Sequence, residues 1–335
     1  MTTACAPGKV ILCGEHAVVY GRPAIAVPVS EVQAQATVEP ARDGRGVVID
    51  APDLNRRLAV RDADDGDPLA RIVRLALRAI DVQGEPDLTI TVTSTVPIAR
   101  GMGSGAAVST AIVRALAGHY DRWFSSRDIS DLVYQTELIY HGTPSGIDNS
   151  TAAHGGLIFF RRNEAGKAQV RPLSAACSVP LVIALGREPR ATQMTVGALR
   201  QRRAADPQRH EQLFDEIHRL VADAERAIVA GDLAELGVLM NSNHGLLGTL
   251  GVSTDELESM VTLARRGGAL GAKLTGGGGG GAVICLCPDG REQLVDAFAR
   301  AGWQAFLADI AQEGRGGADG KDDAKGVERR HAARA

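Results

Sequence analysis

Apolar and polar positions follow two different periods along the first half of the chain. The stretches KVILCG (9–14) and AIAVPVSEVQAQATVEP (24–40) are apolar or alternate residue by residue, which predicts two strands joined by the turn at YGRPA. The stretch DLTITVTSTVPI (87–98) also alternates, with its large apolar side chains on one face. Between these strands, PLARIVRLALRAI (68–80) has apolar residues at helical spacing, which predicts an amphipathic helix.

Longer helical periods dominate the second half. The apolar run SVPLVIALG (178–186) predicts a strand that opens a second domain. Three helical patterns follow, at about 208–230, 233–248 and 254–267. The third begins with Ser253 and Glu256 at the spacing of a capping box. The stretches EQLVDAFARAG and WQAFLADI predict a final helix and a final strand.

These patterns divide the chain into three parts. We place a domain boundary near residue 175, which gives an N-terminal domain over 1–174 and a C-terminal domain over 175–312. The last segment, 313–335, is charged, rich in glycine and almost free of large apolar residues. Such a segment buries too little apolar surface to offset its ordering entropy, so we expect a disordered tail.

Composition narrows the class of protein. A chain of 335 residues with 44% hydrophobic residues can bury a large core, and its length favours two domains. A net charge of -3 with only 4% aromatic residues does not suit nucleic-acid binding. No apolar stretch reaches 18 residues and no signal-peptide pattern is present, so we expect a cytoplasmic protein that does not associate with membranes. The five irregularly spaced cysteines suggest reduced thiols.

Glycines 101, 103 and 105 flank a serine in the segment PIARGMGSGAAV, between a predicted strand and a predicted helix. Glycines let the backbone approach an anion closely, and a helix start offers free N–H groups and a positive dipole end. A phosphate-binding loop and a tight turn without a ligand explain the segment equally well. Ser104 is then either a phosphate contact or a helix N-cap. A Walker loop would close with a lysine, but no lysine follows until Lys167, which leaves open what neutralises the phosphates.

A second glycine run, KLTGGGGGG (273–281), follows a predicted helix and precedes the apolar strand AVICLC. Six consecutive glycines often form a linker. This run lies inside a helix-to-strand unit, so we favour a loop whose backbone wraps something closely, with Thr275 adding a hydroxyl contact. Lysine is scarce, at five of the 37 basic residues, and two of the five stand beside glycine-rich segments.

Two further segments carry polar residues with both structural and chemical interpretations. In PGKVILCGEHAVVYG, Lys9 opens an apolar strand, and Glu15 and His16 interrupt it. In ELIYHGTPSGIDNSTAAHGG, Glu137 lies at the end of a helix and Asp148 follows a turn. Taken singly, each residue has a structural explanation. Lys9 would be a solvated strand end, Glu15 and His16 a polar turn, Glu137 a solvated glutamate, and Asp148 a helix cap.

Taken together, the segments carry a family resemblance. APGKVILCGEHAVVYG, PIARGMGSGAAV and KLTGGGGGGAV occur in the order of three motifs of the GHMP kinases, and the chain resembles that superfamily over its predicted folded length. The versions GEHAVVYG and HGTPSGIDN, and the segment NHGLLGTLGVS, look like those of the mevalonate kinases rather than the galactokinases.

The resemblance implies an α+β fold of two domains, with the active site in the cleft between them. The N-terminal domain would be similar to ribosomal protein S5 domain 2, and the C-terminal domain would be ferredoxin-like. The implied reaction is ATP-dependent phosphorylation of the C5 hydroxyl of (R)-mevalonate to 5-phosphomevalonate, in isoprenoid biosynthesis. Another GHMP kinase activity (on phosphomevalonate or homoserine) and a non-catalytic ligand sensor on the same fold are the alternatives. Mevalonate kinases are often dimers, so a homodimer is one of the states to test.

The resemblance also implies roles for individual residues. Asp148 matches the catalytic base, and Lys9 would lie beside it, where an ammonium keeps the carboxylate ionised and stabilises a developing alkoxide. Glu137, 11 residues before Asp148, matches a ligand of Mg²⁺, which would offset charge during phosphoryl transfer. Glu15 and His16 match substrate-binding positions. The positions that match ATP-binding residues are Ser94, Ala99, Arg100, Gly101, Met102, Gly103, Ser104, Gly105, Thr275, Gly276 and Gly278.

One departure from the family pattern concerns the metal. The common motif reads Gly-Leu-Gly-Ser-Ser, and its second serine contributes to Mg²⁺ binding, but Gly105 stands at that position here. Either Ser104 or water then completes the coordination, or Glu137 holds the ion with ATP alone. Because Mg²⁺ normally keeps several waters, we expect a working kinase.

Overall fold

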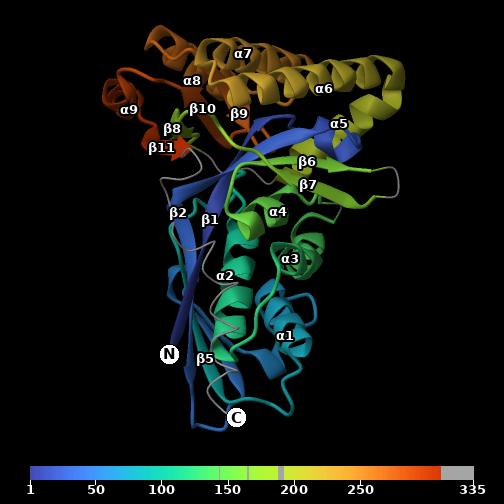
Figure 1. Cartoon of the computed structure of the whole chain (residues 1–335), viewed down its shortest axis with the longest axis vertical. Helices are drawn as coiled ribbons and strands as arrows, with labels where there is room; N and C mark the ends of the chain where they lie inside the picture. Colours follow the sequence, from blue (N-terminus) through green and yellow to red (C-terminus); the bar gives the residue numbers. More distant parts are fainter. Residues whose placement is uncertain (143, 164–165, 188–191, 311–335) are drawn as a thin grey trace, which may run out of the picture.

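The computed structural model describes residues 1–142, 144–163, 166–187 and 192–310 (Figure 1). The predicted disordered tail, 313–335, lies outside the described residues. Within them, no helix is both long enough and apolar enough to cross a membrane.

The described strands form two sheets. A seven-stranded sheet has the order β4-β3-β5-β2-β6-β7, with β1 paired to β2, and a four-stranded sheet has the order β11-β8-β10-β9. The strands of the first sheet are β1 (Thr2–Cys13), β2 (Ala24–Pro40), β3 (Val47–Ala51), β4 (Arg56–Ala59), β5 (Leu88–Ser94), β6 (Ile158–Arg162) and β7 (Ala168–Pro172). Those of the second are β8 (Val179–Leu185), β9 (Gly271–Thr275), β10 (Ala282–Leu286) and β11 (Gln304–Ile310).

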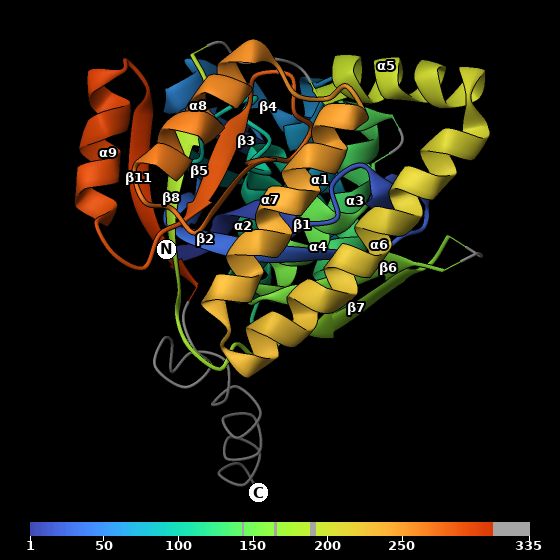
Figure 2. The ribbon, with the colours of Figure 1, turned by 90° about the horizontal axis from the view of Figure 1, so that it is seen from above.

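Helices cover both sheets. The helices of the N-terminal half are α1 (Pro68–Ile80), α2 (Ser104–His119), α3 (Ser126–His141) and α4 (Ile147–His154), with short 3₁₀ turns η1 (Ala17–Tyr20), η2 (Pro52–Leu54) and η3 (Val60–Asp62). Those of the C-terminal half are α5 (Thr192–Ala205), α6 (Pro207–Ala230), α7 (Leu233–Thr249), α8 (Asp255–Arg266) and α9 (Arg291–Arg300). Helix α2 packs along β1 and β2, and α1, α3 and α4 pack around α2 (Figure 1). Helices α6 and α7 lie side by side over the end of β1 (Figure 2).

The second sheet confirms the predicted ferredoxin-like arrangement. Numbered along the chain, its strands lie in the order 4-1-3-2, and every pair is antiparallel. One helix, α9, joins the third strand to the fourth, and the long α5–α8 segment stands between the first and second strands. This is a β-α-β-β-α-β unit with an enlarged first helical connection.

Helix α1 shows why the sequence pattern predicted its limits well. The carboxylate of Asp67 accepts hydrogen bonds from the backbone N–H groups of Leu69 and Ala70, both at 3.0 Å. Pro68 occupies the first position, where no hydrogen bond is lost, and Asp81 ends the helix in a left-handed conformation. The predicted range 68–80 coincides with the observed helix.

The capping box predicted at the start of α8 is wrong. The N-cap is Thr254, whose hydroxyl accepts a hydrogen bond from the N–H of Leu257. The carboxylate of Glu256 instead accepts hydrogen bonds from the backbone N–H of Arg187 and the indole N–H of Trp303, both at 2.9 Å. Tertiary contacts to the residues after β8 and to the α9–β11 connection therefore take the side chain that the local pattern assigned to the cap.

Candidate active site

Three separate segments meet at Lys9 on β1. Its backbone N–H donates to the carbonyl of Met102 at 2.9 Å, and its Nζ donates to the carbonyl of Gly101 at 3.0 Å. The same Nζ lies 2.9 Å from Oδ1 of Asp148 on α4. Lys9 is only 2% exposed. The lysine therefore ties the glycine loop and α4 to the first strand, rather than lying in solvent at a strand end.

The glycine loop 97–103 has an unusual backbone. Ala99, Gly101 and Gly103 all have positive φ, at 56°, 74° and 70°. A Cβ at Gly103 would lie 3.1 Å from Cγ of Lys9, so this position needs glycine for space as well as for conformation. Ala99 adopts the same left-handed region without that freedom, a local strain of the kind often found at functional sites.

Ser104 is the first residue of α2, and the N-cap position belongs to Gly103, which makes no side-chain cap. The N-cap interpretation of Ser104 is therefore wrong. The start of α2 has no side chain capping its N–H groups, which leaves them available to an anion.

Two carboxylates stand together beside Lys9. Glu137 on α3 is 2% exposed, so it is not the solvated glutamate that its place at a helix end suggested. Burial, together with the nearby charge of Asp148, raises the pKa of Glu137 to about 8, although Lys9 opposes this. Asp148 is the second residue of α4 and does not cap the helix, because Gly146 is the N-cap.

Two cavities open on either side of this group. The first, which we call the basic cavity, has a volume of about 480 Å³ and is lined by Lys9, His16 and Arg200 among others. The second, which we call the loop cavity, has a volume of about 520 Å³. Gly101, Glu137 and Asp148 line both cavities. The predicted ATP-binding residues that line the loop cavity are Ser94, Ala99, Gly101, Met102, Gly103, Ser104 and Gly105.

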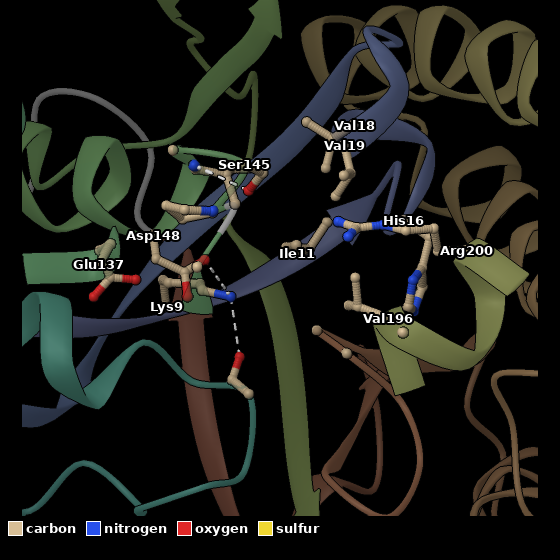
Figure 3. Close-up of a pocket in the computed structure, with 18 residues that line it drawn as sticks. Lys9, Ile11, His16, Val18, Val19, Glu137, Ser145, Asp148, Val196 and Arg200 are labelled. Atoms are coloured by element: carbon tan, nitrogen blue, oxygen red, sulfur yellow. Dashed lines mark hydrogen bonds and ion pairs between the residues drawn. The ribbon is translucent and has the colours of Figure 1, made fainter. Parts of the chain in front are cut away.

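The basic cavity is polar at both ends. Lys9, Asp148 and Glu137 lie at one end, His16 and Arg200 at the other, and Ile11 lies between them (Figure 3). Burial lowers the pKa of His16 to about 4; the charges of Arg202 and Lys273 add to this, and a backbone hydrogen bond at Gly277 opposes it. The imidazole is therefore neutral at physiological pH, and its buried Nε2 has no hydrogen-bond partner among the described residues.

Four predicted site residues have other contacts. Glu15 lines neither cavity and forms a fully buried ion pair with Lys273 on β9, so it does not fit the predicted role in substrate binding. Thr275 also lines neither cavity. Its hydroxyl accepts from the N–H of Ile11 at 2.8 Å and donates to the carbonyl of the same residue at 3.1 Å, so it links β9 to β1, and its contact to ATP stays a prediction. The guanidinium of Arg100 donates to the carbonyl of Arg187 at 2.9 Å. 

The fourth, Gly278, belongs to the second glycine run, which packs tightly against protein backbone. A Cβ at Gly278 would lie 2.2 Å from the carbonyl oxygen of Val252, and one at Gly276 would lie 2.9 Å from that of Gly101. The run does wrap something closely, as the sequence suggested, but what it meets is the first glycine loop and the α7–α8 connection. Gly276 lines the basic cavity, and Gly278 lines neither.

Sequence reasoning missed three residues of this region. Lys273 is a lysine within a short apolar segment, which is a signal for a buried ion pair. Tyr140 lines the loop cavity and lies three residues after Glu137, on the same helical face. Arg200 reaches the basic cavity from α5, and nothing in its local sequence indicates this.

The donor set fits a magnesium ion bound together with phosphates. Among the described residues, no group of three or more His, Cys, Asp or Glu side chains is placed to hold a metal. Two carboxylates, Glu137 and Asp148, line the loop cavity with the hydroxyl residue Ser104. Mg²⁺ is commonly bound by one or two carboxylates, substrate phosphates and water, so this set suits an ion that arrives with a nucleotide.

Comparisons with known proteins agree with this architecture. Residues 69–156 match the sequence profile of the GHMP kinases N terminal domain, and residues 224–304 match that of the GHMP kinases C terminal domain. A mevalonate kinase of Thermococcus gammatolerans is 34% identical over 332 residues, which cover 93% of this chain and 96% of the relative.

Solved structures give the same result. The crystal structure of L. major mevalonate kinase in complex with R-mevalonate matches with a TM-score of 0.79 and 30% identity, covering 93% of this chain and 97% of that chain. The Methanococcus jannaschii mevalonate kinase structure matches with a TM-score of 0.78 and 25% identity, covering 91% and 96%. The two profiles match parts of both halves of the chain, and the relative and the solved structure each cover 93% of it, so the chain belongs to the GHMP kinase family.

Proposed function

We propose that this chain transfers the γ-phosphoryl group of ATP to the C5 hydroxyl of (R)-mevalonate, releasing 5-phosphomevalonate and ADP. The relatives named mevalonate kinase, which are similar over nearly the whole chain, support this activity. The observation that carries the proposal is that two cavities of about 480 and 520 Å³ meet at one pair of carboxylates.

The shared wall suits a group transfer between two bound molecules. In this proposal ATP occupies the loop cavity, with its phosphates at the start of α2, and the acceptor alcohol occupies the basic cavity. Phosphoryl transfer depends chiefly on positioning and on charge stabilisation, with the attacking and leaving oxygens roughly in line. Gly101, Glu137 and Asp148 border both cavities, so the transferred group would pass beside them.

Asp148 is the proposed general base. Its carboxylate would accept the proton of the C5 hydroxyl as the O–P bond forms and the bond to the leaving ADP oxygen breaks. The ammonium of Lys9, 2.9 Å away, would hold that carboxylate in place and stabilise negative charge on the attacking oxygen. Lys9 is itself fixed by Gly101 and Met102, so its position is set by the loop that borders the nucleotide.

The proposed metal is Mg²⁺, held by Glu137 and Ser104 together with phosphate oxygens. When bound, it would offset charge on the transferring phosphoryl group. Burial and the charge of Asp148 raise the pKa of Glu137 to about 8 even with Lys9 nearby, so a bound Mg²⁺ would favour its ionised form.

The far end of the basic cavity suits the carboxylate of the acceptor. Mevalonate carries a carboxylate at one end and its C5 hydroxyl at the other. With the hydroxyl at Asp148, the carboxylate would face Arg200 and the neutral His16 (Figure 3). The guanidinium would supply the charge, and an imidazole N–H would supply a hydrogen bond.

A substrate panel tests the proposed function. Purified protein would be incubated with ATP and Mg²⁺ and with mevalonate, 5-phosphomevalonate or homoserine, and ADP release would be followed. We expect turnover with mevalonate alone. Turnover with another alcohol and not with mevalonate would assign a different member of the family, and ATP binding without turnover on any alcohol would support the sensor.

We further propose the setting in which the enzyme works. The five cysteines are free thiols, which supports a reducing, cytoplasmic environment.

The proposed domain boundary near residue 175 falls between Pro172, the last residue of the first sheet, and Val179, the first of the second. A homodimer stays a prediction, and sedimentation velocity would test it.

A further inference from the structure

Gly105 leaves a space that an aromatic ring fills. It is the second residue of α2, and a Cβ built on it would lie 2.8 Å from Cε2 and 3.1 Å from Cδ2 of Tyr140. Carbon atoms at 2.8 Å are well inside van der Waals contact, so no other residue fits at 105 while the ring keeps its place.

Tyr140 lies close to both Glu137 and the start of α2. It follows Glu137 by three residues on α3, which puts both side chains on one face of that helix. Tyr140, Glu137, Ser104 and Gly105 all line the loop cavity. The ring therefore borders the first turn of α2, where backbone N–H groups and the helix dipole attract an anion.

The phenol is uncharged where the triphosphate would lie. Burial, with the charges of Glu137 and Asp67 adding to it and that of Arg56 opposing it, raises the pKa of Tyr140 to about 12. A neutral phenol brings no negative charge to the phosphates, so the ring can lie beside them without charge repulsion.

We infer that Tyr140, packed over Gly105, is a positioning residue that forms the side wall of the loop cavity and holds the triphosphate of ATP against the start of α2. The identity of the nucleotide rests on the proposed function. The two residues act as one unit, because the ring keeps its place only while position 105 has no side chain.

A double-mutant cycle tests this unit. Binding of Mg²⁺ with a non-hydrolysable ATP analogue would be measured by calorimetry, and the KM values for ATP and mevalonate would be measured in turnover. Y140A should weaken nucleotide binding about tenfold, the loss expected for one aromatic contact. Y140F keeps the ring and should stay within about twofold of the wild-type protein. G105A displaces the ring and should resemble Y140A, whereas the double variant should bind no more weakly than Y140A alone.

Control variants distinguish an effect on the wall of the loop cavity from a general effect on folding. Alanine favours a helix more than glycine does, which offsets part of the cost of displacing the ring, so G105A should melt close to the wild-type protein. I139A is a matched control, because Ile139 is 37% exposed like Tyr140 and lines neither cavity. It should leave nucleotide binding unchanged, and in Y140A the KM for mevalonate should move far less than the KM for ATP.

Additive losses in the double variant, or G105A binding as tightly as the wild-type protein, would overturn the inference. So would equal changes in the two KM values. Calorimetry measures nucleotide binding without the acceptor alcohol, so it tests the role of Tyr140 separately from the proposed function. If the variants bind nucleotide as expected but the protein does not phosphorylate mevalonate, the proposed function is wrong and the inference about Tyr140 still holds.

Discussion

At the scale of single residues, the site is defined by which side chains are buried together. Lys9 and Glu137 are each 2% exposed, and Asp148 joins them at the junction of two cavities. Buried charges are costly unless they are paired or ligated, so this group indicates a site with bound ions rather than a structural cluster alone. His16 adds a neutral imidazole at the other end of the basic cavity.

Replacing Asp148 by asparagine should remove the base and keep the shape of the site. We expect kcat to fall by about 10²–10⁴, the usual contribution of a general base. Steady-state kinetics and nucleotide calorimetry would measure the loss and show ATP binding largely intact. The matched control is D131N, since Asp131 is exposed on α3 and should not affect turnover. An unchanged kcat in D148N would exclude the carboxylate as the base.

The buried His16 should make the fold sensitive to acid. Its pKa is about 4 in the folded protein and about 6.5 when unfolded, so the unfolded state binds more protons between these values and stability falls as the pH drops. From pH 7 to pH 4 this residue should cost about 3 kcal/mol. The variant H16N, which keeps a polar side chain at this position of positive φ, should lack that part of the loss. Urea unfolding at both pH values measures it, and equal losses in the two proteins would argue against this assignment.

At the scale of elements, a buried polar clamp joins the first strand to the second sheet. Lys273 on β9 pairs with Glu15 and also donates to the carbonyl of Ile11, 3.5 Å away, which Thr275 contacts too. Asn243 on α7 accepts from the N–H of Gly14 at 3.2 Å. The segment 11–15, which continues into His16, is thus held by the C-terminal domain, and both domains determine where the basic cavity lies.

The variant K273M should break this clamp. It leaves the carboxylate of Glu15 buried without its cation, and removing one partner of a buried pair typically costs about 3–5 kcal/mol. The double variant K273M/E15Q should recover much of that loss, because no uncompensated charge is left. Urea denaturation of the three proteins measures both effects. A loss below about 1 kcal/mol in K273M, or no recovery in the double variant, would show that the pair does not hold the domains.

Elements that depend on local pattern could be predicted from the sequence, and contacts between domains could not. The range of α1 follows from its own apolar spacing and its Asp67 cap, so the prediction was accurate. Glu256 resembled part of a cap in the sequence, but in the structure it accepts a hydrogen bond from the indole N–H of Trp303, in the α9–β11 connection. Thr275 and Glu15 likewise belong to motifs that suggested ligand contacts, but residues of the other domain engage both side chains.

The residues of the candidate site likewise divide into those that the sequence predicted and those that it did not. Lys9, Glu137 and Asp148 were predicted to converge because they match family motifs, and the structure places them around one junction. Tyr140 and Arg200 were not predicted, since their roles depend on how α3 and α5 pack. The departure at Gly105 was visible in the sequence, but only the structure shows that a tyrosine fills the space.

At the scale of the whole molecule, the two glycine runs bring the domains into contact at the site. Gly276 approaches Gly101 so closely that a Cβ at position 276 would lie 2.9 Å from the carbonyl oxygen of Gly101. Gly101 borders both cavities and Gly276 borders the basic cavity, so the domain junction and the proposed reaction centre lie together. We therefore propose that a nucleotide and an alcohol, bound in separate cavities, meet at Asp148.

A crystal structure with a non-hydrolysable ATP analogue, Mg²⁺ and (R)-mevalonate tests this claim most directly. We predict the triphosphate at the start of α2 in the loop cavity, with the mevalonate carboxylate near Arg200 and its C5 oxygen within hydrogen-bond distance of Asp148. That oxygen should point at the γ-phosphorus. Mevalonate bound with its hydroxyl remote from Asp148, or a nucleotide outside the loop cavity, would contradict the account.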